Sequence, residues 1–357
     1  MLAVDLGQDP EFAQLRDETR ELALAAGFAV AGVMEARRVQ PDRRHFIGAG
    51  KLAELKELME ACGAKVLVIA HAVSDGQHMR LGRELGCEVF DYPGLILTIF
   101  AKRAQTAEGK LQVELAQEIY GRAKLRGAWT HLERQRGGLG ATGGPGERQI
   151  ELDRRMIARR IKQLRRRLAK RHTHAQLVAA GRMKRLPTVA LVGYTNAGKS
   201  TVFQALTKAA VPASARMFET LDTTTRQMHL GGGRCAALSD TVGFVRNLPH
   251  ELVDAFRSTL NEAVEADLLL LVLDGQDRAG PAKLRTIQET LATIGAAGVP
   301  QLLLLNKLDL GQSPELLDSL RWDKMPFLSI SALTGAGLQE LRDRVAASLA
   351  TPAAAVR

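Results

Sequence analysis

The middle of the chain reads Gly193-Tyr194-Thr195-Asn196-Ala197-Gly198-Lys199-Ser200, which fits the pattern G-x-x-x-x-G-K-[ST]. The apolar run 189–192 before it is typical of a buried strand, and the run 201–206 after it is typical of the first turns of a helix. In such a loop, backbone N–H groups surround a phosphate, the lysine adds positive charge and the serine hydroxyl binds magnesium. We therefore predict phosphate contacts from these residues: Gly193, Asn196, Ala197, Gly198, Lys199, Ser200 and Thr201.

Two later segments indicate which base is bound. Asn306-Lys307-Leu308-Asp309 follows the apolar run 302–305, so its polar groups emerge at the carboxyl end of a strand, where open α/β sheets bind ligands. A carboxylate at Asp309 can accept from both the N1–H and the exocyclic amine of guanine, a donor pair that adenine does not offer. The second segment, Ser329-Ile330-Ser331-Ala332, follows another short apolar strand and can supply a backbone N–H to the guanine carbonyl. The predicted base contacts are Asn306, Lys307, Asp309, Ser331 and Ala332.

A fourth segment, Asp240-Thr241-Val242-Gly243, follows the strand-like run 236–239. Asp240 can hold magnesium through water, and the Gly243 N–H can reach a γ-phosphate. In the order phosphate loop, D-x-x-G, N-K-x-D and S-A, each at a strand end, the segments resemble the translation-factor branch of P-loop GTPases. We therefore predict an α/β fold with a Ras-like GTPase domain over residues 187–357, an enzyme that hydrolyses GTP to GDP and phosphate.

The residue after Gly243 sets this chain apart. Ras-like GTPases place a glutamine there to orient the attacking water, whereas this chain has Phe244, whose side chain cannot form that hydrogen bond. We expect slow intrinsic hydrolysis that depends on another group. Asn196 indicates one such group, because GTPases with asparagine at this position often bind potassium beside the phosphates. The alternative is that Asn196 only fits a tight turn.

Residues 218–226 form the predicted switch I segment, which becomes ordered around the nucleotide. Phe218 and Asp222 are predicted to contact GTP. Both Thr220 and Thr224 are candidates for the threonine that reaches magnesium in the GTP-bound state. Residues of this segment would therefore complete the magnesium site that begins with Ser200 and Asp240.

The net charge of +10 is concentrated in one segment, because residues 147–187 hold fourteen Lys or Arg and three acidic residues, a local net of +11. Its apolar residues recur at the 4-3-4 spacing of a narrow helical seam: Ile157, Ile161, Leu164 and Leu168. The pattern breaks at His172-Thr173-His174, which predicts that residues 175–185 fold back as the second helix of a hairpin. Uncompensated charges repel one another unless a polyanion shares them. We therefore predict RNA binding by Arg159, Arg160, Arg165, Arg166 and Arg167.

Residues 1–136 form a separate predicted domain. The strand-like run 66–70 lies between helical patterns at 51–62 and 75–85, and a short strand follows at 88–90, so we expect a small parallel α/β sheet. The stretch 95–125 predicts one or two helices. They lead into a loop with six glycines at 137–146, and residues 137–186 are assigned to this loop and the basic helical hairpin.

Stretches along nearly the whole chain resemble the HflX family of GTPases. They are FIGAGKL at 46–52, DYPGLIL at 91–97, EGKLQVELAQ at 108–117, WTHL at 129–132, GPGE at 144–147, Asp153-Arg154-Arg155, and the phosphate loop. The resemblance implies a GTPase that binds the large ribosomal subunit and its RNA and, in some members, splits stalled ribosomes under stress. It also favours Thr220 over Thr224 as the magnesium ligand beside Ser200 and Asp240. The predicted catalytic residues are Lys199, Thr220 and Gly243.

The composition agrees with this assignment. The three cysteines lie far apart without metal-ligand spacing, and we find neither a signal peptide nor an apolar run of membrane-spanning length. We expect a monomeric cytoplasmic protein without membrane insertion, with magnesium and potassium as its cofactors. One alternative is an RNA-remodelling protein that binds ATP near Lys51, although Gly48-Ala49-Gly50-Lys51 departs from the phosphate-loop pattern. Another is a signalling switch with a protein effector, which leaves the +11 segment unexplained.

Overall fold

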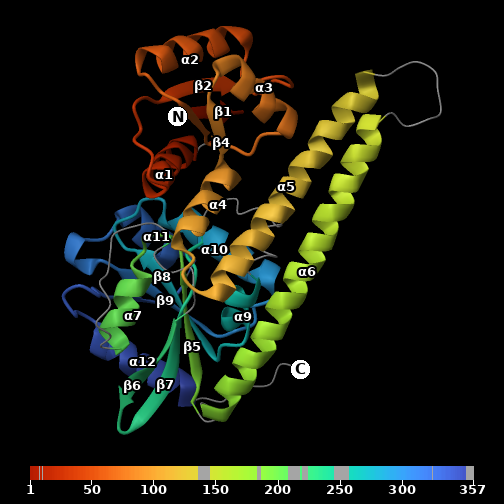
Figure 1. Cartoon of the computed structure of the whole chain (residues 1–357). Coiled ribbons are helices and arrows are strands. Elements are labelled where there is room, and N and C mark those ends of the chain that lie inside the picture. The colour runs from red at the N-terminus through yellow and green to blue at the C-terminus, as the bar shows by residue number, and fades with distance from the viewer. Residues whose placement is uncertain are drawn as a thin grey trace. The chain divides into compact units, whose positions relative to one another are not determined.

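A computed structural model of the chain describes residues 1–7, 9, 11–135, 145–182, 186–207, 218, 224–244, 257–323 and 325–350. These residues form two compact units, and Figure 1 shows the elements of each. The first is built from Met1–Lys102 and Lys110–Lys170, and the second from Arg103–Gly109 and the described residues from Arg171 onward. In the described part of the chain, no helix is long and apolar enough to cross a membrane.

The first unit contains a parallel four-stranded sheet in the order β2-β1-β3-β4, which confirms the small α/β domain predicted here. Its elements are β1 (Leu2–Leu6), α1 (Phe12–Ala25), β2 (Met34–Arg38), α2 (Ala49–Ala61), β3 (Val66–Ile69), α3 (Asp75–Leu85), β4 (Glu88–Asp91) and α4 (Tyr92–Arg103). Buried side chains of β1 and β3 pack with Leu52 and Leu55 of α2 in one core. Ser74 caps α3 through a capping box with Gln77, so the predicted helix begins where its sequence signal lies.

This unit also contains most of two long helices, α5 (Ala107–Gln135) and α6 (Pro145–Arg182). They lie side by side in Figure 1, and the Arg160 Nε of α6 donates to the Glu114 carboxylate of α5 at 3.1 Å. The predicted seam is confirmed for Ile161, Leu164 and Leu168, which are buried. The sequence segment 137–144 of the glycine-rich loop lies outside the described residues.

The predicted fold-back of residues 175–185 onto the first half of the basic segment is wrong. The basic segment is one helix from Pro145 to Arg182, and it continues through His172-Thr173-His174. Histidine and threonine are only modest helix formers, less favourable than alanine by up to about 0.7 kcal/mol, and neither glycine nor proline stands between them. The hairpin instead pairs α6 with α5, whose charges are mixed.

The second unit contains a six-stranded sheet in the order β10-β9-β8-β5-β7-β6, parallel except for the edge strand β6. Its elements are β5 (Thr188–Gly193), α7 (Lys199–Thr207), β6 (Thr224–Gly231), β7 (Arg234–Asp240), α9 (Arg257–Val264), β8 (Leu268–Asp274), α10 (Gly280–Ile294), β9 (Gln301–Asn306), the 3-10 turn η1 (Leu308–Leu310), α11 (Pro314–Trp322), β10 (Phe327–Ser329) and α12 (Leu338–Ala350). This is the predicted Ras-like arrangement.

Helices α7 and α12 share one core with the central strands of this sheet. Val202 and Phe203 of α7 pack with Leu341 and Val345 of α12 against alternate residues of the strands, among them Leu191 and Leu270. The intervening residues Leu269 and Leu271 are also buried, so the strands read as continuous apolar runs. Strand β5 lies between β7 and β8, and the loops that follow these strands meet at one edge of the sheet.

Candidate functional site

The phosphate loop connects β5 to α7, as the sequence predicts. Asn196 and Gly198 have positive φ angles of 62° and 89°, and Lys199 begins the helix. A Cβ on Gly198 would collide with the side-chain nitrogen of Asn306, so only glycine fits there without displacing its neighbour. The loop therefore has a compact left-handed turn that packs directly against the end of β9.

The Lys199 side chain points back into this loop. Its Nζ donates to the carbonyl oxygens of Gly193 at 3.1 Å and Tyr194 at 2.9 Å. Burial lowers the pKa of Lys199 to about 8, and the nearby Asp240 carboxylate partly offsets this. The ammonium is thus held by neutral carbonyl dipoles in a buried place, where an anion would favour its charged form.

Ser200 and Asp240 meet beside the loop. The Ser200 Oγ donates to the Asp240 Oδ2 at 2.8 Å, and the Asp240 side chain is buried at the end of β7. The register of the sheet explains the meeting, because Asp240 pairs with Leu191 of β5. The structure thus brings together two of the three predicted magnesium ligands, Ser200 and Asp240.

The segment after Asp240 lies against the phosphate loop. The Thr195 N–H donates to the Phe244 carbonyl at 2.9 Å, and the Phe244 N–H donates to the Gly193 carbonyl at 3.0 Å. A Cβ on Gly243 would lie 2.9 Å from the Thr195 Cγ2 and 3.0 Å from the Lys199 Nζ. Gly243 therefore stands close to the loop because it has no side chain, and two backbone hydrogen bonds hold the next residue in place.

The predicted base contacts are linked by hydrogen bonds. The Asn306 side chain donates to the Ala197 carbonyl at 3.1 Å and accepts from the Ala332 N–H at 3.0 Å. The Ser331 hydroxyl donates to the Asp309 carboxylate and accepts from the Thr334 N–H. Asn306 thus joins the phosphate loop to the segment after β10, and these contacts fix the positions of both guanine-recognition segments.

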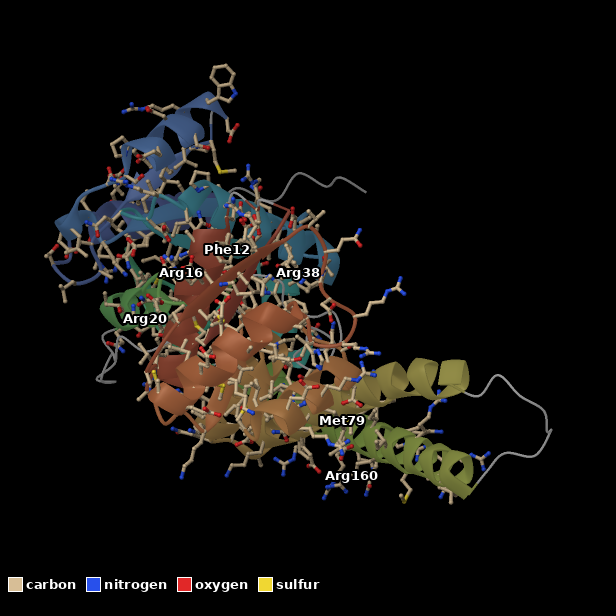
Figure 2. All side chains as sticks on the ribbon, turned by 90° about the horizontal axis from the view of Figure 1, so that it is seen from above. Phe12, Arg16, Arg20, Arg38, Met79 and Arg160 are labelled. Atoms are coloured by element: carbon tan, nitrogen blue, oxygen red, sulfur yellow. The ribbon has the colours of Figure 1, made fainter. Side chains whose placement is uncertain are left out.

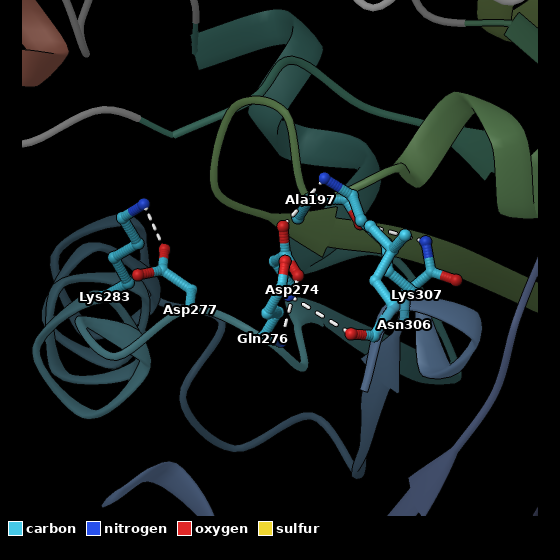
Figure 3. A network of polar contacts seen from close by, with 8 residues as sticks. Ala197, Asp274, Gln276, Asp277, Lys283, Asn306 and Lys307 are labelled. Atoms are coloured by element: carbon cyan, nitrogen blue, oxygen red, sulfur yellow. Dashed lines mark hydrogen bonds and ion pairs between the residues drawn. The ribbon is translucent and has the colours of Figure 1, made fainter. Parts of the chain in front are cut away.

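Figure 3 shows two residues near Asn306 that the sequence did not indicate, Asp274 and Gln276. Lys307 forms an ion pair of 2.7 Å with Asp274, whose other oxygen accepts from the Gln276 N–H. Asp274 ends β8 exactly opposite Asn306 in the sheet register, so its position at a strand end was the available signal. This ion pair orients Lys307 beside the base-recognition segment.

A second ion pair in Figure 3 supports the phosphate loop from α10. Lys283 pairs with Asp277 at 2.5 Å, and its Nζ lies 4.8 Å from the centre of the Tyr194 ring. A cation above an aromatic face is attracted by the ring quadrupole. Tyr194, which is buried, is therefore fixed from the side of the loop that faces α10.

The predicted switch I residues are described only in part. Phe218 is buried with a φ of 53°, whereas Thr220 and Asp222 lie outside the described residues. Thr224, the other candidate for the magnesium ligand, is the exposed first residue of β6 and stands opposite Asp240 in the antiparallel pair. Thr201 follows Ser200 in the first turn of α7 and is half-buried.

The five predicted RNA-binding arginines differ in their surroundings. Arg159, Arg165, Arg166 and Arg167 are exposed on α6, and among the described residues they form no ion pair. Arg160, labelled in Figure 2, is instead half-buried and paired with Glu114 of α5. Leu152 and Met156, one to two turns before Arg159, are 52% and 56% exposed. The accessible surface of α6, where its side chains are described, is therefore mainly basic and includes the large apolar side chains of Leu152 and Met156.

The N-terminal candidate for a second nucleotide contact has an ordinary helical setting. Gly48 is the N-cap of α2, and Lys51 in its first turn pairs with Glu54 at 2.5 Å. Lys51 thus has a carboxylate partner on its own helix. The contacts described here give no support to the ATP-binding alternative.

Known proteins match most of the chain. Three family profiles match consecutive parts: GTP-binding GTPase N-terminal at residues 14–101, GTP-binding GTPase Middle Region at 103–182, and 50S ribosome-binding GTPase at 188–307. GTPase HflX of Escherichia coli (strain K12) is 43% identical over 336 residues, which cover 94% of this chain and 78% of that protein. GTPase HflX of Caldanaerobacter subterraneus subsp. tengcongensis is 42% identical over 310 residues, covering 87% and 72%.

A solved structure agrees with these relatives. The crystal structure of SsGBP in complex with GDP is 27% identical, covers 97% of both chains and superposes with a TM-score of 0.54. The nucleotide pocket assembled above therefore belongs to a GTP-hydrolysing enzyme. On the identity to its relatives and the length that they share, this chain belongs to the HflX family of GTPases.

Proposed function

We propose that this GTPase binds the large ribosomal subunit through ribosomal RNA, and that it splits or rescues stalled ribosomes under stress. The observation that carries the proposal is the set of four exposed arginines on α6, Arg159, Arg165, Arg166 and Arg167, which form no ion pair within the described residues. The match of residues 188–307 to a family described as 50S ribosome-binding GTPase supports the same partner.

The charge of α6 explains why the partner is RNA. Four exposed guanidinium groups fall within nine residues of one helix, so they repel one another across about two turns. Phosphate groups spaced along a nucleic acid can share these charges, and the release of counterions makes such binding dependent on salt. Leu152 and Met156 on the accessible surface can contact bases or sugars beside the phosphates.

The GTPase unit supplies the regulation in this proposal. The side-chain oxygens of Ser200 and Asp240 suit magnesium, which prefers hard oxygen donors, and Thr220 of the switch I segment would complete the set. When bound, magnesium neutralises charge on the β- and γ-phosphates. Gly243 would donate its N–H to the γ-phosphate, so the segment after Asp240 would change its contacts with the nucleotide state.

Potassium is the second cofactor that we propose. Asn196, whose side chain is exposed at the turn of the phosphate loop, would hold the ion beside the phosphates. Its charge would stabilise the negative charge that develops during phosphoryl transfer, in place of an arginine finger. This would compensate in part for the phenylalanine that stands at position 244.

The experiment is co-sedimentation of the full chain with purified large ribosomal subunits over a salt titration, with a GTP analogue and with GDP. The α6 variant changes four arginines to Gln: Arg159, Arg165, Arg166 and Arg167. It should bind more weakly, and the negative slope of log affinity against log salt should become smaller in magnitude by roughly 3 to 4 units. The matched control removes four arginines from the GTPase unit: Arg278, Arg285, Arg321 and Arg344.

Two results would count against the proposal. If the chain does not sediment with the subunit in either nucleotide state, the ribosomal partner is wrong. If it sediments but the two quadruple variants show the same salt slope, α6 is not the RNA-binding surface. GTP hydrolysis without ribosomes should change little in the α6 variant, since the nucleotide-pocket residues described above begin at Gly193.

A further inference from the structure

One polar group of the phosphate loop has no role in the contacts described above, the hydroxyl of Thr195. Its Oγ1 is buried and, in the described structure, has no hydrogen-bond partner, and the residue is 6% exposed. By contrast, the buried Thr241 hydroxyl donates to the Leu191 carbonyl at 2.6 Å. Because an unsatisfied buried hydroxyl costs free energy, its presence points to a partner that arrives with a ligand.

The position of Thr195 indicates which part of the ligand it meets. The Thr195 Cγ2 lies 2.9 Å, and the Lys199 Nζ 3.0 Å, from the place that a Cβ on Gly243 would take. The Thr195 methyl group, the Lys199 ammonium and the Gly243 backbone therefore converge at one point, and the Thr195 hydroxyl is carried on the same Cβ as that methyl, so rotation about χ1 can bring it to this point. Lys199 and Gly243 are the groups expected at the γ-phosphate, so Thr195 stands at the same end of the nucleotide.

This end of the pocket needs a group that can orient water. Phe244 occupies the position of the water-orienting glutamine, and both its N–H and its carbonyl are engaged with the phosphate loop. A threonine hydroxyl can donate one hydrogen bond and accept two. It can therefore accept from the attacking water while it donates to a γ-phosphate oxygen.

We propose that the Thr195 hydroxyl is a catalytic residue that orients the water attacking the γ-phosphate. In the reaction, the water oxygen bonds to the γ-phosphorus and the bond from that phosphorus to the bridging oxygen breaks. The electron pair of the broken bond stays on GDP, both protons of the water leave with the phosphate product, and Thr195 ends unchanged. The proposal concerns the hydrolysis that the chain performs by itself and is independent of the ribosomal partner.

The test is single-turnover GTP hydrolysis by the full chain without ribosomes, with GDP affinity measured in parallel. Thr195→Val keeps the shape of the side chain and should slow hydrolysis about 10-fold, the effect of one hydrogen bond of about 1.4 kcal/mol. GDP affinity should stay within about two-fold, and Thr195→Ser should recover most of the rate. The control Thr290→Val removes a hydroxyl that donates to a helix carbonyl of α10 and should behave as wild type.

Three results would overturn the proposal: a wild-type hydrolysis rate in Thr195→Val, a rate loss that serine does not recover, or a rate loss matched by an equal loss of GTP affinity. Binding of a fluorescent GDP analogue shows whether each variant is folded. If Thr195→Val does not bind it, the comparison of Thr195→Ala with Thr195→Ser decides, because these variants differ in the hydroxyl and both are smaller than threonine. Equal rates in that pair would reject the role of the hydroxyl.

Discussion

The two ends of the nucleotide pocket differ in how far they are prepared for the ligand. At the base end, Asn306 already joins the phosphate loop to Ala332, and Asp309 already accepts from Ser331. At the γ-phosphate end, Lys199 donates to loop carbonyls and Phe244 is bonded to the loop through its backbone. The hydrogen bonds of the base end join the two guanine-recognition segments to each other and to the phosphate loop. At the phosphate end, Lys199 and the Phe244 backbone bond to the loop itself, while the Thr195 hydroxyl has no partner in the described structure.

This difference assigns different energetic roles to the two ends. A rigid base end contributes affinity without a cost of rearrangement, because its side chains are already oriented. The phosphate end must exchange internal hydrogen bonds for contacts with the nucleotide, and the free energy of that exchange reduces the net affinity. The exchange also makes the segment around Gly243 sensitive to whether a γ-phosphate is bound, which a rigid end could not be.

The largest effect should come from removing the Lys199 ammonium or the Ser200 hydroxyl at the phosphate end. Lys199→Ala, and likewise Ser200→Ala, should abolish detectable GTP turnover, a loss of roughly 100- to 1,000-fold, because a preorganised group that faces the transferring phosphate is removed. Multiple-turnover phosphate release measures this, with the unfolding temperature as a check on folding. Substantial turnover in folded Lys199→Ala would mean that Lys199 keeps its carbonyl partners when GTP binds.

The base end can be tested through its specificity. Asp309→Asn should weaken GTP binding by about 2–4 kcal/mol, roughly 30-fold or more, and should shift preference toward xanthosine triphosphate, because an amide can donate where the xanthine carbonyl accepts. The variant retains an oxygen that can accept from Ser331. Competition binding with both triphosphates measures the shift, and unchanged GTP affinity would show that this segment does not read the base.

The burial of Lys199 should appear as a pH dependence of nucleotide affinity. Its pKa is lowered to about 8 by burial, and bound phosphate should restore the pKa toward the ordinary lysine value of about 10.4. The contribution of the Lys199 ammonium to GDP affinity is therefore complete well below about pH 8 and is lost as the pH rises through this value. GDP affinity should fall about 10-fold between about pH 7 and pH 9.

Titration calorimetry in two buffers of different ionisation heat measures this effect and the accompanying proton uptake. The matched variant is Lys199→Arg, because its guanidinium stays charged over the whole range and its affinity should not depend on pH in this way. An affinity of the wild-type chain that is flat from about pH 7 to about pH 9 would contradict the assignment to Lys199.

The sequence predicted the base end better than the phosphate end for a physical reason. Asn306 and Asp309 follow a short run of leucines that is typical of a buried strand, so their place at the sheet edge follows from local pattern. The approach of Gly243 to Thr195 and Lys199 depends instead on how two loops from different strands fold onto each other. Neither spacing nor propensity contains that information, and Thr195 was therefore missed.

The first unit shows the same distinction. The helix Asp75–Leu85 was predicted with its exact bounds, since Ser74 and Gly86 supply local signals at its two ends. Strand β2 (Met34–Arg38) was missed because it is a charged edge strand without an apolar run. The helix that pairs with α6 was also misassigned, because the Arg160–Glu114 contact joins residues 46 positions apart.

The smallest effect, and the one that separates two explanations of a single residue, concerns Asn196. Its φ of 62° lies in the left-handed region, which asparagine tolerates better than most residues, so the turn alone could account for it. If Asn196 also holds potassium, basal hydrolysis should be several-fold faster in potassium than in sodium, because the ion would stabilise charge in the transition state.

Asn196→Gly allows the same backbone conformation and removes the amide, so it should bind GDP normally and lose the difference between the two salts. Asn196→Ala should lose the difference and also weaken GDP binding, because alanine lacks the polar side chain that lets asparagine tolerate the left-handed conformation. Single-turnover hydrolysis in the two chlorides at equal ionic strength decides between the explanations: a salt difference that persists in Asn196→Gly would leave the residue with a conformational role only.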